Sequence, residues 1–442
     1  MKLDVCQSYV ERDARVLAPC QHLSYFPLVV ARAEGSMITD EDGNQFIDFL
    51  SSASSLNLGS VNPMVTKAIT DQLNTFAQYT QAYCYSRVEV EYAERLTSVY
   101  PGGVPAKVVF GNCGSDANDC AVKFSRAYTG RQKIITFING YHGNTYGSST
   151  LSTCSPKMHE KMGPFLPEVY SFPFYGVDQP DEVVEKQCLA QMELAFGSYL
   201  PASEVAAIII EPVQGDGGLL PAHPIFMKKL YELCKKHGIL FISEEVQQGF
   251  FRAGKWFSIE NYDIIPDGII MGKSVGASLT LGAFMGRAEI MDCLPAPAHL
   301  FTLGGNAVAC AAGIAAFDYY KTEEFQDVLL KNTALLEDLA ADLLEKHPKT
   351  AAFSRSLGFS MGIGVNGTET ETADNSCFKI LVRCYEKGLL IISVAGNILR
   401  IQPPLNIDHE LIEKGFAILD EAMTEFEQGK ISDDVLKYNA GW

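Results

Sequence analysis

Short apolar runs alternate with amphipathic stretches through the middle of the chain. Four runs are rich in β-branched residues and apolar on both faces, as buried parallel strands are. They span residues 133–137, 207–210, 239–242 and 268–271. Residues 225–237 instead carry apolar side chains at helical spacing, with lysines in the last turn and Gly238 as the cap. This alternation predicts βαβ units and a sheet covered by helices on both sides.

The last third of the chain has a different pattern. Residues 327–344 and 410–426 predict amphipathic helices, and strand-like pieces such as 389–393 lie between them. Polar and apolar residues alternate over 37–50 around a turn, and we expect this segment to join the C-terminal part. The predicted division is therefore an N-terminal segment, 1–60, that joins the small domain, a large domain, 61–310, and a C-terminal small domain, 311–442.

Composition and charge narrow the function classes. The 442 residues include 35 Lys plus Arg and 53 Asp plus Glu, a net charge of −18 that argues against nucleic acid or anionic membranes as partners. The chain has no long apolar run and no apolar N-terminal leader, so we expect a cytoplasmic protein. The twelve cysteines form no CxxC pair, and the histidines form no HExxH pair. We therefore expect neither a disulfide scaffold nor a metal site.

Two glycine-rich turns are candidate sites of chemistry. Gly114 and Ser115 open a predicted helix, where free backbone N–H groups suit a phosphate, although a simple helix cap has the same pattern. Lys273 follows the strand 268–271 in Gly-Lys-Ser, but a P-loop would need glycine where Asp267 stands. Lys273 is then either a solvated lysine or an amine that forms a Schiff base.

Charged residues follow other predicted strands. Glu244 and Glu211 each come directly after a strand, at the sheet edge where ligands bind, although a solvated strand end has the same pattern. Arg400 precedes a rigid Pro-Pro pair and suits either a substrate carboxylate or a structural ion pair. A phosphate cup, an amine, an acid for a pyridine nitrogen and an arginine together match what pyridoxal phosphate (PLP) requires.

At this point the sequence resembles the class III aminotransferases, PLP enzymes of fold type I. The resemblance runs from about residue 37 to 405 and rests on motifs in the family's order. These are Gly114-Ser115, Gly140-Tyr141-His142-Gly143, Glu211-Pro212-Val213-Gln214-Gly215, Glu245-Val246-Gln247, Lys273 and Thr302. The resemblance implies an α/β fold with a mostly parallel seven-stranded sheet between helices in the large domain, and a smaller α+β domain.

The resemblance also implies individual roles. Lys273 would be the Schiff-base lysine, Tyr141 would stack on the pyridine ring, and Gln247 would face the 3-oxygen of the cofactor. Thr302 would reach the phosphate in a neighbouring subunit, so the family implies a homodimer with shared sites. Whether dimers pair further into tetramers stays open. Glu244 stands where the family usually has Asp, and its extra methylene needs about 1.5 Å of room.

Within this family, several stretches are similar to the isoleucine 2-epimerase type of amino-acid racemase. They are residues 114–119, 125–132, 296–302 and 395–400, with the terminal Gly441-Trp442. A racemase must return a proton to the opposite face of Cα, and a second acid/base there is the simplest solution. Asp216, in the loop after Glu211, is the candidate, although Asp also suits a turn of this kind.

The leading hypothesis is a PLP-dependent 2-epimerase or racemase of aliphatic amino acids such as isoleucine, acting by Cα deprotonation. Lys273 and Asp216 would be catalytic, and Arg400 would hold the substrate carboxylate. The alternative is a class III aminotransferase, of 4-aminobutyrate or another amino donor, in which Glu211 and Arg400 would form a switchable ion pair. A cofactor-binding homologue without turnover is a third hypothesis, which only Glu244 supports.

Overall fold

The computed structural model describes residues 1–439, so Gly441 and Trp442 of the resemblance lie outside the described residues. The chain divides into two compact units. Unit 1 combines Met1–Asn62 with the chain from Glu323 onward, and unit 2 is Pro63–Thr322. The sequence places the second boundary at residue 310, within helix α11 (Ala307–Tyr320). This helix packs on α3 (Pro63–Thr75) and α4 (Arg87–Ser98), which puts it in unit 2.

Unit 2 is built on a seven-stranded sheet with the order β4-β12-β11-β10-β7-β5-β6. The strands are β4 (Ala106–Gly111), β12 (Gly282–Arg287), β11 (Gly268–Met271), β10 (Leu240–Glu244), β7 (Val205–Ile210), β5 (Lys133–Phe137) and β6 (Val169–Phe172). β12 is antiparallel to both of its neighbours, and the other pairs are parallel. The expected α/β fold with a mostly parallel seven-stranded sheet is therefore confirmed.

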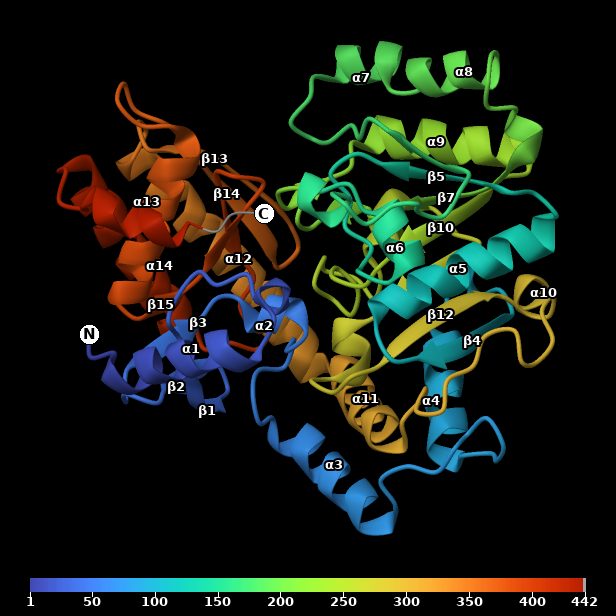
Figure 1. Cartoon of the computed structure of the whole chain (residues 1–442), viewed down its shortest axis with the longest axis horizontal. Coiled ribbons are helices and arrows are strands. Elements are labelled where there is room, and N and C mark those ends of the chain that lie inside the picture. Colours follow the sequence, from blue (N-terminus) through green and yellow to red (C-terminus); the bar gives the residue numbers. More distant parts are fainter. Residues whose placement is uncertain (440–442) are drawn as a thin grey trace. The chain divides into compact units, whose positions relative to one another are not determined.

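Helices cover this sheet because its strands are apolar on both faces (Figure 1). α5 (Gly114–Thr129) packs across β12, β11 and β7, and its Phe124 joins the core that contains Ile209 and Ile242. Phe241 precedes Ile242 in β10, so its side chain points to the opposite face of the sheet. There it packs edge-on against Tyr231 of α9 (Pro224–His237), with 5.6 Å between the ring centres. The remaining elements of unit 2 are α6 (Tyr146–Leu151), α7 (Asp181–Gln187), α8 (Ala190–Phe196), α10 (Ala288–Met291) and the β8–β9 pair (Val213–Gln214, Leu220–Pro221).

Unit 1 contains two four-stranded sheets and flanking helices. One sheet has the order β1 (Val30–Glu34), β2 (Met37–Asp40), β3 (Gln45–Asp48), β15 (Leu389–Leu390). The other has the order β13 (Ala351–Leu357), β14 (Ser360–Val365), β17 (Ile398–Ile401), β16 (Ile392–Val394). The helices are α1 (Asp4–Val16), α2 (Ser51–Ser54), α12 (Glu323–Lys346), α13 (Ala373–Glu386) and α14 (His409–Glu427). β15 pairs with β3 in parallel, so this sheet joins the N-terminal and the C-terminal chain segments of unit 1.

The helices and the cysteines bear on the environment of the chain. Over residues 1–439, none of the helices is long and apolar enough to cross a membrane. All twelve cysteines are free thiols, and seven of them are buried.

Candidate active site

Three of the predicted site residues of unit 2 lie at one edge of its sheet. β11, β10 and β7 are adjacent parallel strands, so their carboxyl ends meet at the same edge. Glu244 is the last residue of β10, Glu211 directly follows β7, and Lys273 comes two residues after β11. Ligands of open α/β sheets bind at this edge.

The start of α5 forms a closely packed cup beside these strand ends. A Cβ atom at Gly114 would lie 2.7 Å from Val246 Cγ1, and one at Gly143 would lie 2.1 Å from Ser115 Oγ. Ser115 Oγ accepts a hydrogen bond from the backbone N–H of Asn144 at 3.2 Å. The first turn of a helix presents N–H groups without intrahelical partners, so the cup suits an anion such as phosphate.

Glu244 is an acid held in the interior of unit 2. Its side chain is 3% exposed and accepts hydrogen bonds from Asn118 Nδ2 at 3.4 Å and from the backbone N–H of Val246 at 3.3 Å. Burial raises the pKa of Glu244 well above its ordinary value, the charge of Glu211 raises it further, and the charge of Lys273 lowers it. A cationic partner at this carboxylate would therefore stabilise its charged form strongly.

Glu211 connects two loops of the site. Its carboxylate accepts the backbone N–H of Tyr141 at 2.9 Å and that of Gly215 at 3.1 Å. Burial and the charge of Asp216 raise the pKa of Glu211 to about 7, against the lowering effect of these two hydrogen bonds and of Lys273. The charges of Lys273 and Asp216 thus both act on Glu211.

Lys273 is half-buried and begins the 3₁₀ turn Lys273–Gly276. Its φ of 47° lies in the left-handed region, where a residue with a side chain is strained. The turn is anchored by Tyr92, whose hydroxyl donates to the carbonyl of Val275 at 2.6 Å. A Cβ atom at the preceding Gly272 would lie 3.0 Å from Gly114 Cα, so the lysine turn packs directly against the cup. Strain that packing maintains in this way is common at functional sites.

Tyr141 and Gln247 complete the group around the strand ends. Asn144 Nδ2 donates to the Tyr141 hydroxyl at 3.1 Å, and burial with the charge of Asp216 raises the pKa of Tyr141 to about 12. Gln247 is buried and accepts a hydrogen bond from Gln248 Nε2 at 2.9 Å. A Cβ atom at Gly215 would lie 2.3 Å from Gln247 Oε1, so the Glu211 loop packs against this side chain.

Two further predicted residues, Thr302 and Arg400, lie in different units of the chain. Thr302 is exposed, and its carbonyl accepts from Gln78 Nε2 at 3.4 Å. Asn306 Nδ2 donates to Gln78 Oε1 at 3.2 Å, so these contacts hold the Thr302 loop against the segment 76–86. Arg400 belongs to unit 1, where it lies in β17 and is 2% exposed.

Sequence reasoning missed two residues that hold the site together. Asn118 Nδ2 bridges the Gly114 carbonyl, at 3.0 Å, and the Glu244 carboxylate, and Asn144 bridges Ser115 and Tyr141. Asn118 lies inside a helix and Asn144 in a loop. Neither position has a local signal that sets it apart from an ordinary polar residue.

The sequence matches the family of class III aminotransferases over residues 20–423. The chain belongs to this family. It is 38% identical to isoleucine 2-epimerase of Lentilactobacillus buchneri over 100% of both chains, and 34% identical to leucine/methionine racemase of Thermococcus litoralis over 99% of both. Among solved structures, a Bacillus anthracis aminotransferase superposes with a TM-score of 0.85 and is 28% identical, covering 96% of this chain and 100% of that one.

Class III aminotransferases use PLP, and the residues of this member fit that cofactor. Close packing excludes a side chain at several glycines around the cup. At Gly282, for example, a Cβ atom would lie 2.0 Å from the Cys113 carbonyl oxygen. Three buried side-chain atoms near the strand ends have no hydrogen-bond partner within residues 1–439: Asn118 Oδ1, His142 Nδ1 and Gln248 Oε1. A polar cofactor would supply partners to such a site, and the buried carboxyl of Glu244 suits the acid that a pyridine nitrogen needs.

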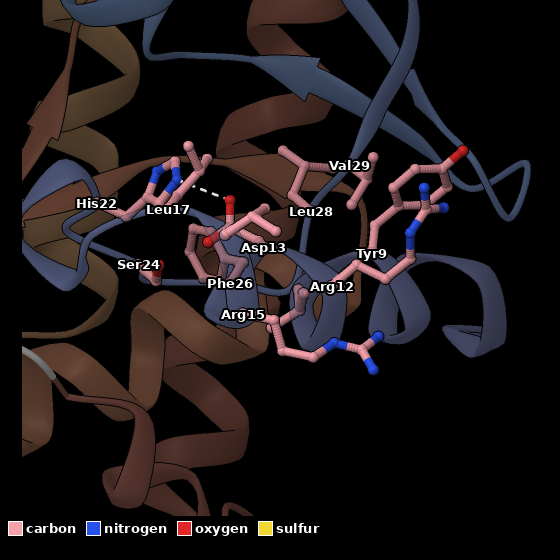
Figure 2. Close-up of a pocket in the computed structure, with 12 residues that line it drawn as sticks. Tyr9, Arg12, Asp13, Arg15, Leu17, His22, Ser24, Phe26, Leu28 and Val29 are labelled. Carbon is pink, nitrogen blue, oxygen red and sulfur yellow. Dashed lines mark hydrogen bonds and ion pairs between the residues drawn. The ribbon is translucent and has the colours of Figure 1, made fainter.

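A cavity lies in unit 1. It has a volume of about 680 Å³ beside α1, and its lining includes Arg12, Phe26 and Leu28. Figure 2 shows these side chains and the ion pair between Asp13 and His22, whose Oδ1 and Nε2 atoms are 3.0 Å apart. It contains none of the predicted site residues.

Proposed function

We propose that this class III enzyme is a PLP-dependent 2-epimerase or racemase of aliphatic amino acids such as isoleucine. The observation that carries the proposal is that the charge of Asp216 acts on Tyr141 and on Glu211, the carboxylate on which Lys273 also acts. A second acid/base near the lysine is what proton return to the opposite face of Cα requires. Two relatives named as an epimerase and a racemase, similar over their whole length, support the same assignment.

The mechanism follows from the residues in these positions. Bound PLP supplies an electron sink that makes the Cα hydrogen of the amino acid acidic. Lys273 Nζ removes or returns the proton on one face of Cα, and Asp216, directly or through water, does so on the other. With the cofactor bound, the carboxylate of Glu244 would keep the pyridine nitrogen protonated, and Tyr141 and Gln247 would hold the ring and its 3-oxygen. Arg400 holds the substrate carboxylate by charge-assisted hydrogen bonds.

Amino transfer is the second candidate function, and the state of Glu211 favours it. A buried carboxyl with a pKa near 7 changes charge easily, as a switchable partner for Arg400 would need to do. The solved aminotransferase that resembles this chain supports the same reading. An aminotransferase requires a 2-oxo acid acceptor, whereas a racemase does not.

The deciding experiment incubates the holoenzyme with L-isoleucine in heavy water without a 2-oxo acid, followed by chiral chromatography. D-allo-isoleucine with deuterium at Cα is the result that we expect. Isoleucine that stays in the L form, with amino transfer only after 2-oxoglutarate or pyruvate is added, would make the protein an aminotransferase.

The role of Asp216 has its own test. Asp216→Asn should lower the rate of racemisation by about 10²- to 10⁴-fold, the usual contribution of a positioned acid/base, and leave the absorbance of the lysine–cofactor bond in place. Asp178→Asn, on the exposed surface of the same unit, is the matched control. An unchanged rate in Asp216→Asn would remove this residue from the mechanism.

We also propose that the protein is a homodimer with shared active sites, in which Thr302 reaches the phosphate of the partner. The support is the exposure of two aromatic residues, Tyr83 (86%) and Tyr85 (104%), a few positions after Gln78, which donates a hydrogen bond to the Thr302 carbonyl. Large exposed apolar surface is typical of interaction sites. The twelve free thiols support the further proposal that the protein works in the cytoplasm, where thiols stay reduced.

A further inference from the structure

A second cavity, of about 310 Å³, lies in unit 2 between α4 and the edge strand β4, which pack side by side (Figure 1). The loop that carries Thr302 closes it on a third side. Most of its wall is apolar, and the polar side chains in its lining are those of Gln81, Glu89 and His299. The apolar part includes Val90, Ala93, Val108, Phe110, Leu300 and Phe301. An apolar pocket with a few polar groups is the usual form of a small-molecule site.

Glu89 brings a carboxylate to this cavity without a cation to balance it. The side chain is half-buried, and burial raises its pKa to about 7, with no charged neighbour in the described chain to offset the effect. The two arginines of the same helix have other partners. Arg87 pairs with Glu91 at 3.6 Å. Arg95 pairs with Asp318 at 2.9 Å. A cation that enters beside Glu89 would therefore stabilise its charged form.

Gln81 adds hydrogen-bonding capacity at the same place. Its Oε1 and Nε2 atoms are buried, and neither has a hydrogen-bond partner within residues 1–439. A Cβ atom at Gly305 would lie 2.6 Å from Gln81 Oε1 and 2.6 Å from Glu89 Oε1. The two oxygen atoms therefore approach one point, and Gly305, with a φ of 66°, leaves room for them. A buried polar atom without a partner in the protein indicates a place for water or a ligand.

His299 does not supply the missing positive charge. Burial and the charge of Lys123 lower the pKa of His299, so its imidazole is neutral near pH 7. Lys123 Nζ donates to His299 Nδ1 at 3.3 Å and to the carbonyl of Ala298 at 3.2 Å. The polar lining therefore consists of a carboxylate, an amide and a neutral imidazole. This set favours a cationic ligand over an anionic one.

We propose that this cavity binds a protonated aliphatic amine. The ammonium group donates charge-assisted hydrogen bonds to the Glu89 carboxylate and the amide oxygen of Gln81. The hydrocarbon part lies against the apolar wall, where burial removes it from water. The site uses none of the residues proposed for catalysis, so it is expected whether the enzyme is a racemase or an aminotransferase.

The test measures binding to the holoenzyme by isothermal titration calorimetry with two ligands of nearly the same shape. N,N-Dimethylbutylamine is a cation that cannot form a Schiff base with the cofactor, because its nitrogen carries three carbon groups. N,N-Dimethylbutanamide is its uncharged counterpart. The titrations are made at about pH 8, where Glu89 is ionised and the amine is still protonated. We expect the amine to bind at one site per chain and the amide to bind about tenfold or more weakly.

Two variants and a control assign the binding to this cavity. Glu89→Gln keeps the shape of the side chain and removes its charge, and we expect it to weaken amine binding by about tenfold or more. Gln81→Leu removes the amide and should weaken amine binding by about two- to tenfold. Glu94→Gln, at an exposed position of the same helix, should bind the amine as the wild type does.

Three outcomes would overturn the proposal. The wild type could show no binding of the amine, or it could bind the amine and the amide equally. Amine binding could also survive Glu89→Gln unchanged. Burial already favours the neutral form of Glu89, so we expect Glu89→Gln to fold. If it does not, Gln81→Leu decides, and unchanged amine binding in that variant would count against the site.

Discussion

Glu211 and Tyr141 are joined by a hydrogen bond from the Tyr141 backbone N–H to Glu211 Oε1, at 2.9 Å. This bond fixes the loop that carries the aromatic ring to the loop that carries Asp216, although 70 residues separate the two partners in the chain. The carboxylate that makes the bond is buried, and its pKa is raised to about 7. The site therefore contains an acid that changes charge near neutral pH.

The pH dependence of stability in the apo protein should reveal this acid. The ordinary pKa of Glu is 4.5, so between about pH 4.5 and 7 folded Glu211 binds a proton that the unfolded chain has lost. The free energy of unfolding must then fall as the pH rises through this window. Glu211→Gln should make the fall in the urea midpoint between about pH 5 and 8 smaller than in the wild type. Glu324→Gln, an exposed change in unit 1, should not alter it. Equal slopes for all three proteins would contradict the prediction.

The rate of the reaction should depend more on the charge of Glu244 than on the length of its side chain. Glu244→Gln cannot hold a proton on the pyridine nitrogen by charge, and we expect it to lower the rate by about 10²-fold. Glu244→Asp keeps the charge but shortens the reach to the ring, so its loss should be smaller. Racemisation and amino transfer are both measured for each variant. If Glu244→Gln and Glu244→Asp lose activity equally, geometry rather than charge decides the role of this residue.

The close packing of the phosphate cup predicts a stability effect. A methyl group at Gly282 would lie 2.0 Å from the carbonyl oxygen of Cys113, a backbone atom that cannot move alone. Gly282→Ala should therefore lower the free energy of unfolding by about 1–3 kcal/mol and weaken PLP binding, because the cup must shift. Gly197→Ala is the control, since its nearest neighbour would lie 3.6 Å away. Thermal melts with and without PLP give both quantities, and an unchanged affinity for PLP in Gly282→Ala would contradict the role of the cup.

The proposed dimer should depend on the exposed tyrosines of unit 2. Replacing Tyr83 and Tyr85 together by Ser removes two aromatic side chains that face solvent in the single chain, and should shift the protein toward monomers in sedimentation velocity. Tyr438→Ser, at an exposed tyrosine of unit 1, should leave the dimer intact. A wild type that sediments as a monomer would refute the proposed dimer. A double variant that remains a dimer would place its interface elsewhere.

The amino-acid sequence by itself determined the layered fold and the family. Buried parallel strands are continuous apolar runs, so β5 and β11 have the bounds that the apolar pattern predicts, and the order of the motifs identified the class III family. The local pattern also marked Lys273 and Glu244, because each lies within two residues of the end of such a strand. These signals are short-range, and one stretch of chain is enough to read them.

Only the tertiary structure decided how distant polar residues support the site. Asn118 contacts Glu244 across 126 positions and Ser54 contacts Arg400 across 346, and no local pattern encodes such pairs. The left-handed turn at residues 51–54 is likewise invisible in its sequence, since serine and alanine have no intrinsic preference for that backbone. It persists because Asp48 and Gln402 hold it, and these partners meet it only when the sheets of unit 1 are assembled.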